Sequence, residues 1–173
     1  MPILLVISGL FLVTAFALAL RASGRKKILA WCIFALLAVP VVVGGIGGML
    51  LSANGLAWRS CVKLPCGLAF VGGILLLLVQ AGAFLWRQLA DWGEVVQTVG
   101  RIYVLLATGF FCLVVGWYGL LFSGIWAGQD RVVERNGQKY VEEHVWMDSD
   151  FYAYSDYCGP FIRGDKMLHM EGK

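Results

Sequence analysis

Residues 64–86 read LPCGLAFVGGILLLLVQAGAFLW, a run in which Gln80 is the single strongly polar side chain. A bilayer core about 30 Å thick needs roughly 20 apolar residues of helix. The run shows no two-residue alternation, so it predicts a membrane-spanning helix rather than a strand. Three further uncharged runs meet the same criterion, at residues 3–20, 28–51 and 102–126. The sequence therefore predicts an all-α membrane protein with four transmembrane helices within residues 1–128.

The composition supports this fold class and excludes several functions. Of 173 residues, 60% are hydrophobic and 14% are charged, whereas soluble domains carry about 25% charged residues. The four runs contain no acidic, basic or histidine side chain, which argues against proton relays and voltage sensors. Both histidines, His144 and His169, follow the last run, so no haem is expected between the helices. We expect no cofactor, no metal and no nucleic-acid partner, and the lipid bilayer as surroundings.

The distribution of basic residues predicts the orientation in the membrane. The loop at 21–27 and the loop after the third run together hold six Lys or Arg, whereas the connection between runs two and three holds two. By the positive-inside rule both termini lie outside the cytoplasm, most simply at a plasma membrane. The first run could be a cleaved signal peptide, but Met1-Pro2 carries no positive charge, which favours a retained helix.

The loop after the third run contains a helical pattern. Leu89, Trp92, Val95, Val96 and Val99 recur at spacings of three and four residues. The pattern fits a short helix lying in the membrane interface. It fits equally well an extension of the third helix beyond the bilayer.

Small residues are concentrated in the second and fourth runs. Small side chains let helix backbones approach closely in a membrane. They could pack the four helices on one another, or present a face to a larger integral membrane protein or to a second copy of the chain. The candidate packing or partner residues are Gly44, Gly45, Gly48, Gly116, Gly119, Gly124 and Gly128.

Residues 129–173 form a polar tail with a predicted β-hairpin. The tail holds nine of the eleven acidic and six of the fourteen basic residues, a net charge of −3. Asn136-Gly137 lies between two β-rich runs, which predicts a two-residue hairpin turn over about 131–146. That turn pairs Glu134 with Lys139 and Arg131 with Glu142, and it places Val132 and Val133 opposite Val141 and Tyr140. Opposite charges and apolar pairs stabilise such cross-strand positions.

The tail is rich in aromatic residues but too short to enclose a large core. It must therefore pack on the outer helix ends, the lipid headgroups or a partner, since Tyr and Phe are common in interface cores. The candidate docking residues are Trp146, Phe151, Tyr152, Tyr154, Tyr157 and Phe161.

Three cysteines lie on the predicted outer side. Cys61, Cys66 and Cys158 could form one disulfide in an oxidising compartment, and the sequence does not decide which two would pair. They also suggest an alternative function as a thiol–disulfide redox membrane protein. Against it, the spacing Cys61-x₄-Cys66 differs from the Cys-x-x-Cys of redox sites.

The tail resembles a group of known proteins in three segments. Tyr140-Val141-Glu142-Glu143, residues 151–157 (FYAYSDY) and residues 160–164 (PFIRG) resemble the tails of small uncharacterised membrane proteins of Gram-positive bacteria. In those proteins a Tyr-rich strand follows a hairpin and leads to an aromatic-x-x-Gly turn. The resemblance implies an extracytoplasmic tail in a cell-envelope context and no catalytic role.

Together these features favour a non-enzymatic accessory or assembly subunit of a larger membrane protein complex. The subunit would dock through its glycine-rich helix faces and its aromatic tail. No catalytic residue is predicted. Besides the redox protein, a homo-oligomeric channel or carrier and an immunity or regulatory protein that binds an extracellular peptide remain alternatives.

Overall fold

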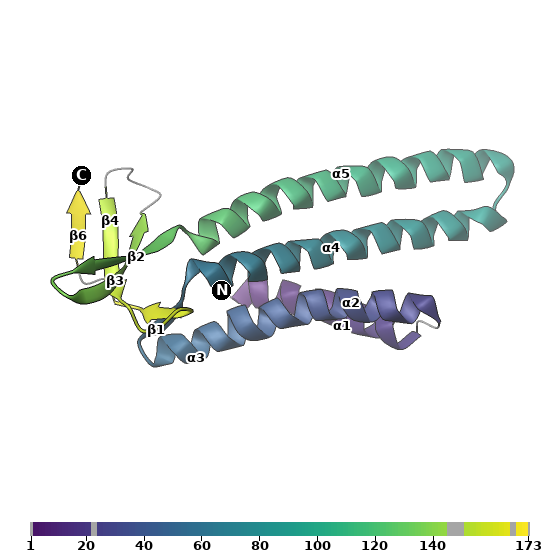
Figure 1. Ribbon diagram of the computed structural model, residues 1–173. Helices are drawn as coiled ribbons and strands as arrows, with labels where there is room; N and C mark the ends of the chain where they lie inside the picture. Colours follow the sequence, from purple (N-terminus) through teal and green to yellow (C-terminus); the bar gives the residue numbers. More distant parts are fainter. Residues whose placement is uncertain (1, 22–23, 145–150, 167–168, 173) are drawn as a thin grey trace. The chain divides into compact units, whose positions relative to one another are not determined.

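The chain is mostly helical, with two small β-sheets whose strands, apart from β1, follow the last helix (Figure 1). A computed structural model describes residues 2–21, 24–144, 151–166 and 169–172. The described part contains five α-helices, one π-helical segment and one 3₁₀ turn. Their bounds are α1 Pro2–Arg21, α2 Arg25–Pro40, η1 Val41–Gly47, α3 Gly48–Ala53, α4 Ser60–Gln88, η2 Leu89–Asp91 and α5 Glu94–Ala127.

Three helical runs are long and apolar enough to cross a membrane: Lys27–Ala53, Ser60–Gln88 and Glu94–Ala127. At 1.5 Å per residue, even the shortest is about 40 Å long, more than the bilayer core requires. They coincide with the predicted second, third and fourth spans. Residues 3–20 are helical as predicted, within α1. The coarse fold class, a helical membrane-type protein, is thus confirmed, with three membrane-length helices.

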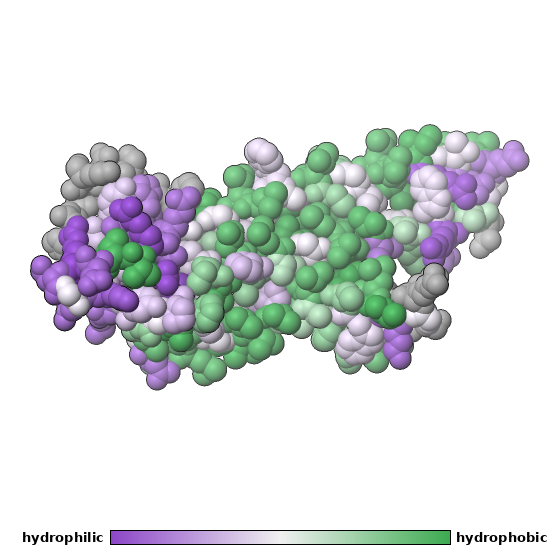
Figure 2. All heavy atoms as spheres, in the orientation of Figure 1, coloured by the Kyte–Doolittle hydropathy of each residue, from purple (hydrophilic) through white to green (hydrophobic). Residues whose placement is uncertain are grey.

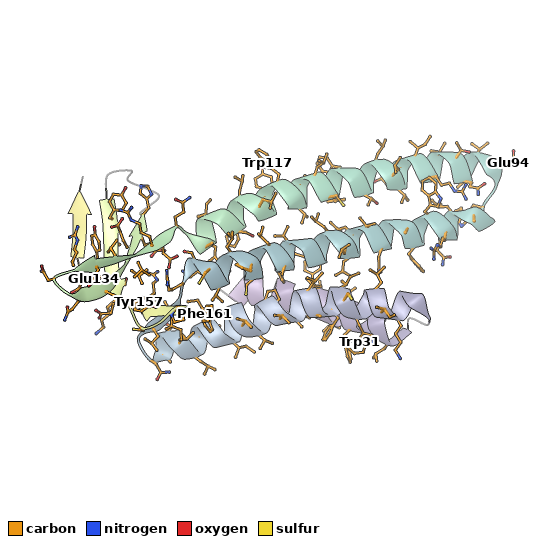
Figure 3. The ribbon with its side chains drawn as sticks, in the orientation of Figure 1. Trp31, Glu94, Trp117, Glu134, Tyr157 and Phe161 are labelled. Carbon is orange, nitrogen blue, oxygen red and sulfur yellow. The ribbon has the colours of Figure 1, made fainter. Side chains whose placement is uncertain are left out.

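The exposed surface of the helices is apolar. Hydrophobic residues cover the visible faces of the helices, and hydrophilic residues gather over the tail strands (Figure 2). On α5, Leu113 is 75% exposed and Trp117 is 67% exposed, and Trp117 projects from α5 on the side away from α4 (Figure 3). Exposed apolar side chains of this size suit a hydrocarbon solvent.

A π-helical segment, η1, interrupts the first of these three runs, Lys27–Ala53. It begins after Pro40, whose ring removes the backbone N–H that an α-helix would use. A Cβ atom on Gly44 would lie 3.3 Å from the Trp126 ring, and one on Gly47 would lie 3.2 Å from the Trp58 ring. The indole N–H of Trp58 donates to the carbonyl oxygen of Val43 at 2.9 Å. These glycines therefore let two tryptophans pack against the π-helical backbone.

The connection between α4 and α5 differs from both sequence-based interpretations. It contains no separate interfacial helix, and α4 does not continue through it, because α4 ends at Gln88 and a 3₁₀ turn follows. Val95, Val96 and Val99 belong to α5, which begins at Glu94. An acidic residue in the first turn is favourable at a helix N-terminus. The periodic residues in 89–99 thus come from the 3₁₀ turn, the bend after it and the start of α5.

The tail forms a four-stranded antiparallel sheet in the order β2-β3-β4-β6. Its strands are β2 Asp130–Arg135, β3 Gln138–His144, β4 Phe151–Asp156 and β6 His169–Gly172. The register of β2 and β3 is the predicted one, including Glu134 opposite Lys139 and Arg131 opposite Glu142. Asn136 and Gly137 have φ values of 52° and 77°, as a type I′ turn requires. Two further strands, β4 and β6, thus extend the predicted hairpin. Residues 145 and 146 of that hairpin lie outside the described residues.

A second, two-stranded sheet joins the tail to the connection between α3 and α4. Strand β1 (Leu56–Trp58) pairs antiparallel with β5 (Ile162–Gly164). This pairing was not predicted from the sequence.

The chain divides into two compact units that cut across the long helices. The helical unit contains Met1–Ala38 and Ala69–Leu120, and the tail unit contains Val39–Leu68 and Leu121–Lys173. This division differs from the predicted 1–128 and 129–173, because residues 39–68 and 121–128 group with the tail. The helical unit has a core of buried side chains, formed by Ala15, Ile33, Leu37 and Leu77.

Candidate functional site

Small residues bring α4 and α5 into close contact within each unit. In the helical unit, a Cβ atom on Gly119 would lie 2.8 Å from the Val71 side chain. In the tail unit, a Cβ atom on Gly67 would lie 2.9 Å from the Ser123 hydroxyl oxygen. Gly119 and Ser123, which lie four residues apart on α5, therefore pack α5 against α4 of the same chain.

The candidate packing glycines fall into two groups. A Cβ atom on Gly44, Gly48, Gly119 or Gly128 would meet another side chain of this chain within 4 Å. Gly45, Gly116 and Gly124 are here called the open glycines. Apart from neighbouring residues and the backbone of their own helix, no atom of the described chain lies within 4 Å of their Cβ positions. Internal packing thus accounts for the first group and not for the open glycines.

Gly116 lies among large exposed side chains on α5. Leu113 and Leu120, three residues before and four after it, are 75% and 56% exposed. Residues at these spacings neighbour one another on a helix surface. Gly116 therefore forms a hollow between two apolar side chains, of the kind that accepts a side chain or backbone from another helix.

The tail unit contains two partly buried ion pairs, here called the junction pairs. The guanidinium Nε of Arg59 lies 2.8 Å from a carboxylate oxygen of Asp130, and their side chains are 12% and 5% exposed. Arg163 lies 2.6 Å from Glu143 and also donates to the hydroxyl of Ser155. Buried charges need such partners, and these pairs join the α3–α4 connection, β2, β3 and β5.

Backbone hydrogen bonds reinforce the same junction. The N–H of Arg59 donates to the carbonyl of Phe161 at 2.9 Å, and the N–H of Asp165 donates to the carbonyl of Gly55 at 2.9 Å. The hydroxyl of Ser60, at the start of α4, donates to the carbonyl of Ala127 at 2.7 Å. Residues 161–165 of the tail are thus bonded to the chain's own α3–α4 connection.

The aromatic residues predicted to dock the tail differ in their surroundings. Tyr154 is 6% exposed and donates through its hydroxyl to Glu142. The Arg59 guanidinium lies over the Tyr157 ring, 5.8 Å from its centroid. Phe161 is 59% exposed, so it is the one among these three that could contact a partner (Figure 3).

The structure says less about the other three aromatic residues that were predicted to dock the tail. The ring of Tyr152 packs edge-on against that of His144. Phe151 is the first residue of β4, and Trp146 lies outside the described residues.

All five cysteines are free thiols in the structure. The thiol of Cys61 donates to the carbonyl oxygen of Pro160 at 3.5 Å, and that of Cys158 donates to the carbonyl oxygen of Asp156 at 3.9 Å. Both are exposed, whereas Cys66 is partly buried. The pairing of these three cysteines stays a prediction at this point.

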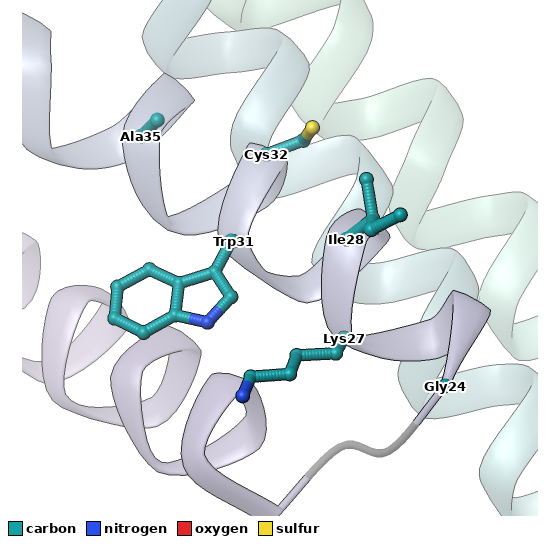
Figure 4. A pocket seen from close by; sticks show the side chains of 6 residues that line it. All are labelled: Gly24, Lys27, Ile28, Trp31, Cys32 and Ala35. Atoms are coloured by element: carbon teal, nitrogen blue, oxygen red, sulfur yellow. The ribbon is translucent and has the colours of Figure 1, made fainter.

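An open depression lies beside the start of α2, lined by Gly24, Lys27, Ile28, Trp31, Cys32 and Ala35 (Figure 4). Among the described residues that line it, Lys27 is the charged one. A Lys and a Trp near a helix end are typical of the membrane interface. The described lining does not offer the convergent polar groups of a ligand site.

No group of three His, Cys, Asp or Glu residues in the described part of the chain could hold a metal ion. Comparison with models of protein families, with curated proteins and with solved structures gives no match. The resemblance of the tail to Gram-positive membrane proteins stays a prediction.

The junction pairs were not predicted from the sequence. The ion-pair roles of Arg59, Asp130, Glu143 and Arg163 become apparent only in the structure. The distribution of charge could have indicated these ion pairs. The short connection that contains Arg59 and Lys63 is basic, whereas the tail is acidic. Such opposite charges on the same predicted side of the membrane favour contact.

Proposed function

We propose that the protein is a non-enzymatic accessory subunit of a larger membrane protein complex. It would contact a larger integral membrane protein through the open glycines, with Phe161 and the tail at the outer surface. The single observation that carries this proposal is the hollow at Gly116, between the exposed side chains of Leu113 and Leu120.

A glycine on an exposed helix face lowers the stability of the helix, and without a packing contact nothing offsets that loss. Glycine is about 1 kcal/mol less favourable than alanine inside a helix. Gly119 offsets that cost by its contact with Val71, but Gly116 and Gly124 have no such contact. A neighbouring helix whose backbone approaches these positions would supply the missing contact.

The proposal includes a four-span topology. Helix α1, with 20 residues, is just long enough to cross the bilayer as well. It would be the first of the four spans in chain order. The basic residues at 21–27 would then lie in the cytoplasm, with both termini and the tail outside the plasma membrane. The junction pairs would hold the tail at the outer ends of α4 and α5.

A pair of bulky substitutions on α5 tests the proposal. Gly116→Leu fills the hollow, and we expect it to abolish stoichiometric co-purification of the partner in mild detergent at native expression levels. Leu106→Phe is the matched control, because it adds bulk at a position that is already large and 65% exposed. Co-purification of the same polypeptides with both variants and with the wild type would contradict the proposed docking face.

A further inference from the structure

We infer that Cys61 and Cys158 form a reversible disulfide that locks the tail to the first turn of α4. The inference rests on the proposed topology, which places both residues outside the cytoplasm, where disulfides form and persist. It commits to one of the three pairings that the sequence leaves open.

The first observation is the position of the two thiols in the tail unit. The Sγ atom of Cys61 lies 3.5 Å from the carbonyl oxygen of Pro160, which is two residues after Cys158 in the sequence. Arg59 also donates to that carbonyl at 3.1 Å, and its guanidinium lies over the ring of Tyr157. Arg59, just before α4, and Cys61, in its first turn, therefore contact the chain on both sides of Cys158.

The second observation is that helix geometry excludes the pair closest in sequence. Cys61 and Cys66 both lie in α4. Five residues of α-helix rise about 7.5 Å, and disulfides require Cα atoms closer than about 7 Å. Cys66 is also partly buried, whereas Cys61 and Cys158 are exposed.

The third observation is that the segment around Cys158 lies at the surface. Cys158 and Pro160 are exposed, and apart from its chain neighbours no described atom lies within 4 Å of the Cβ position of Gly159. A small movement of residues 158–160 and rotation of the two side chains would bring the sulfur atoms together. The backbone bond between Arg59 and Phe161 keeps the two segments adjacent during that movement.

The reaction is a thiol–disulfide exchange with an extracytoplasmic protein disulfide as oxidant. One thiolate of the pair attacks the oxidant's disulfide, giving a mixed disulfide and releasing one oxidant thiolate. The second thiolate then attacks the mixed disulfide, which forms the Cys61–Cys158 bond and releases the other oxidant thiolate. Two thiols of this chain lose two protons and two electrons, and the oxidant disulfide gains them as two thiols.

The consequence would be a tail covalently tied to the membrane-spanning part. The bond would close a long loop, which restricts the unfolded chain. We expect the thermal unfolding midpoint of the oxidised protein to fall by several degrees on reduction, with no such change in Cys158→Ser.

Tryptic mapping of the full-length protein without reduction tests the pairing directly. Trypsin separates Cys61 (peptide 60–63) from Cys66 (peptide 64–87), and it places Cys158 in peptide 140–163. After treatment of the purified protein with oxidised glutathione, we expect peptides 60–63 and 140–163 to be linked. Linkage of peptide 64–87 to either, or no linkage at all, would overturn the inference.

Counting free thiols with a maleimide after denaturation gives an independent readout. With five cysteines in total, the oxidised wild type should take up three labels. Cys61→Ser and Cys158→Ser should each take up four, and the matched control Cys66→Ser should take up two. Five labels on the oxidised wild type would contradict the pairing.

Labelling of intact cells separates this inference from the topology. An impermeant maleimide applied after reduction should label Cys61 and Cys158 if the tail is outside. If it labels neither, the topology is wrong and the disulfide would not form in the cell. The glutathione experiment would still decide whether the geometry permits the bond.

Discussion

At the scale of single residues, Arg59 connects several parts of the tail unit. Its backbone N–H donates to Phe161, and its guanidinium contacts Asp130, the carbonyl of Pro160 and the ring of Tyr157. The planar guanidinium group of Arg59 makes most of these contacts, and the carboxylate of its partner Asp130 is almost fully buried. An Arg in such surroundings is not interchangeable with Lys, because its five donors have a fixed geometry.

Replacing Arg59 should destabilise the tail unit strongly. In Arg59→Met the Asp130 carboxylate stays buried without its cation, which typically costs about 3–5 kcal/mol. Equilibrium unfolding in detergent micelles measures the free energy of unfolding. Lys139→Met is the control, because Lys139 is exposed opposite Glu134 and such surface pairs contribute about 0–1 kcal/mol. Equal losses in the two variants would show that the Arg59–Asp130 pair has no special role.

At the scale of elements, contact partners distinguish glycines that have the same local sequence pattern. Gly116 and Gly119 lie three residues apart on α5, yet only Gly119 meets Val71 of α4. Hydropathy and small-residue spacing cannot separate them, because both depend on sequence position and not on which neighbour occupies each face. The helix pair is therefore predictable from sequence, but its contact face is not.

The two glycines should respond oppositely to the same substitution. Gly119→Ala places a methyl group 2.8 Å from Val71, and overpacking of this kind costs about 1–3 kcal/mol. Gly116→Ala meets open space and should be neutral or stabilising by up to about 1 kcal/mol. Thermal unfolding of the purified chain compares them. Adding Val71→Ala should restore the Gly119→Ala variant, and failure of this rescue would argue against the α4–α5 contact.

The hairpin turn gives a second prediction for an element. Gly137 has φ of 77°, a conformation that costs L-residues other than Gly about 1–2 kcal/mol. Gly137→Ala should therefore speed amide hydrogen exchange in β2 and β3 relative to the wild type. Asn136→Gly keeps a residue that tolerates positive φ and should change the exchange rates little. If the two variants exchange alike, the turn is not of the type described.

At the scale of the whole molecule, the predictable parts are those determined by local sequence. The membrane-length runs follow from hydropathy, and the β2–β3 register follows from Asn136-Gly137 and its flanking charges. The β1–β5 pairing joins three-residue strands more than 100 residues apart, and no local periodicity reports such a contact. The π-helical segment was also not predicted, because its glycines acquire their role only when Trp58 and Trp126 pack on them.

The central claim, that this chain is a subunit of a larger membrane complex, is tested most directly by the mass of the native particle. The protein would be tagged at its chromosomal locus, extracted in mild detergent and weighed by light scattering with the detergent contribution subtracted. We predict a particle that contains at least one different polypeptide in fixed stoichiometry with the 19.0 kDa chain. A monodisperse particle of this chain alone, as monomer or homo-oligomer, would contradict the account.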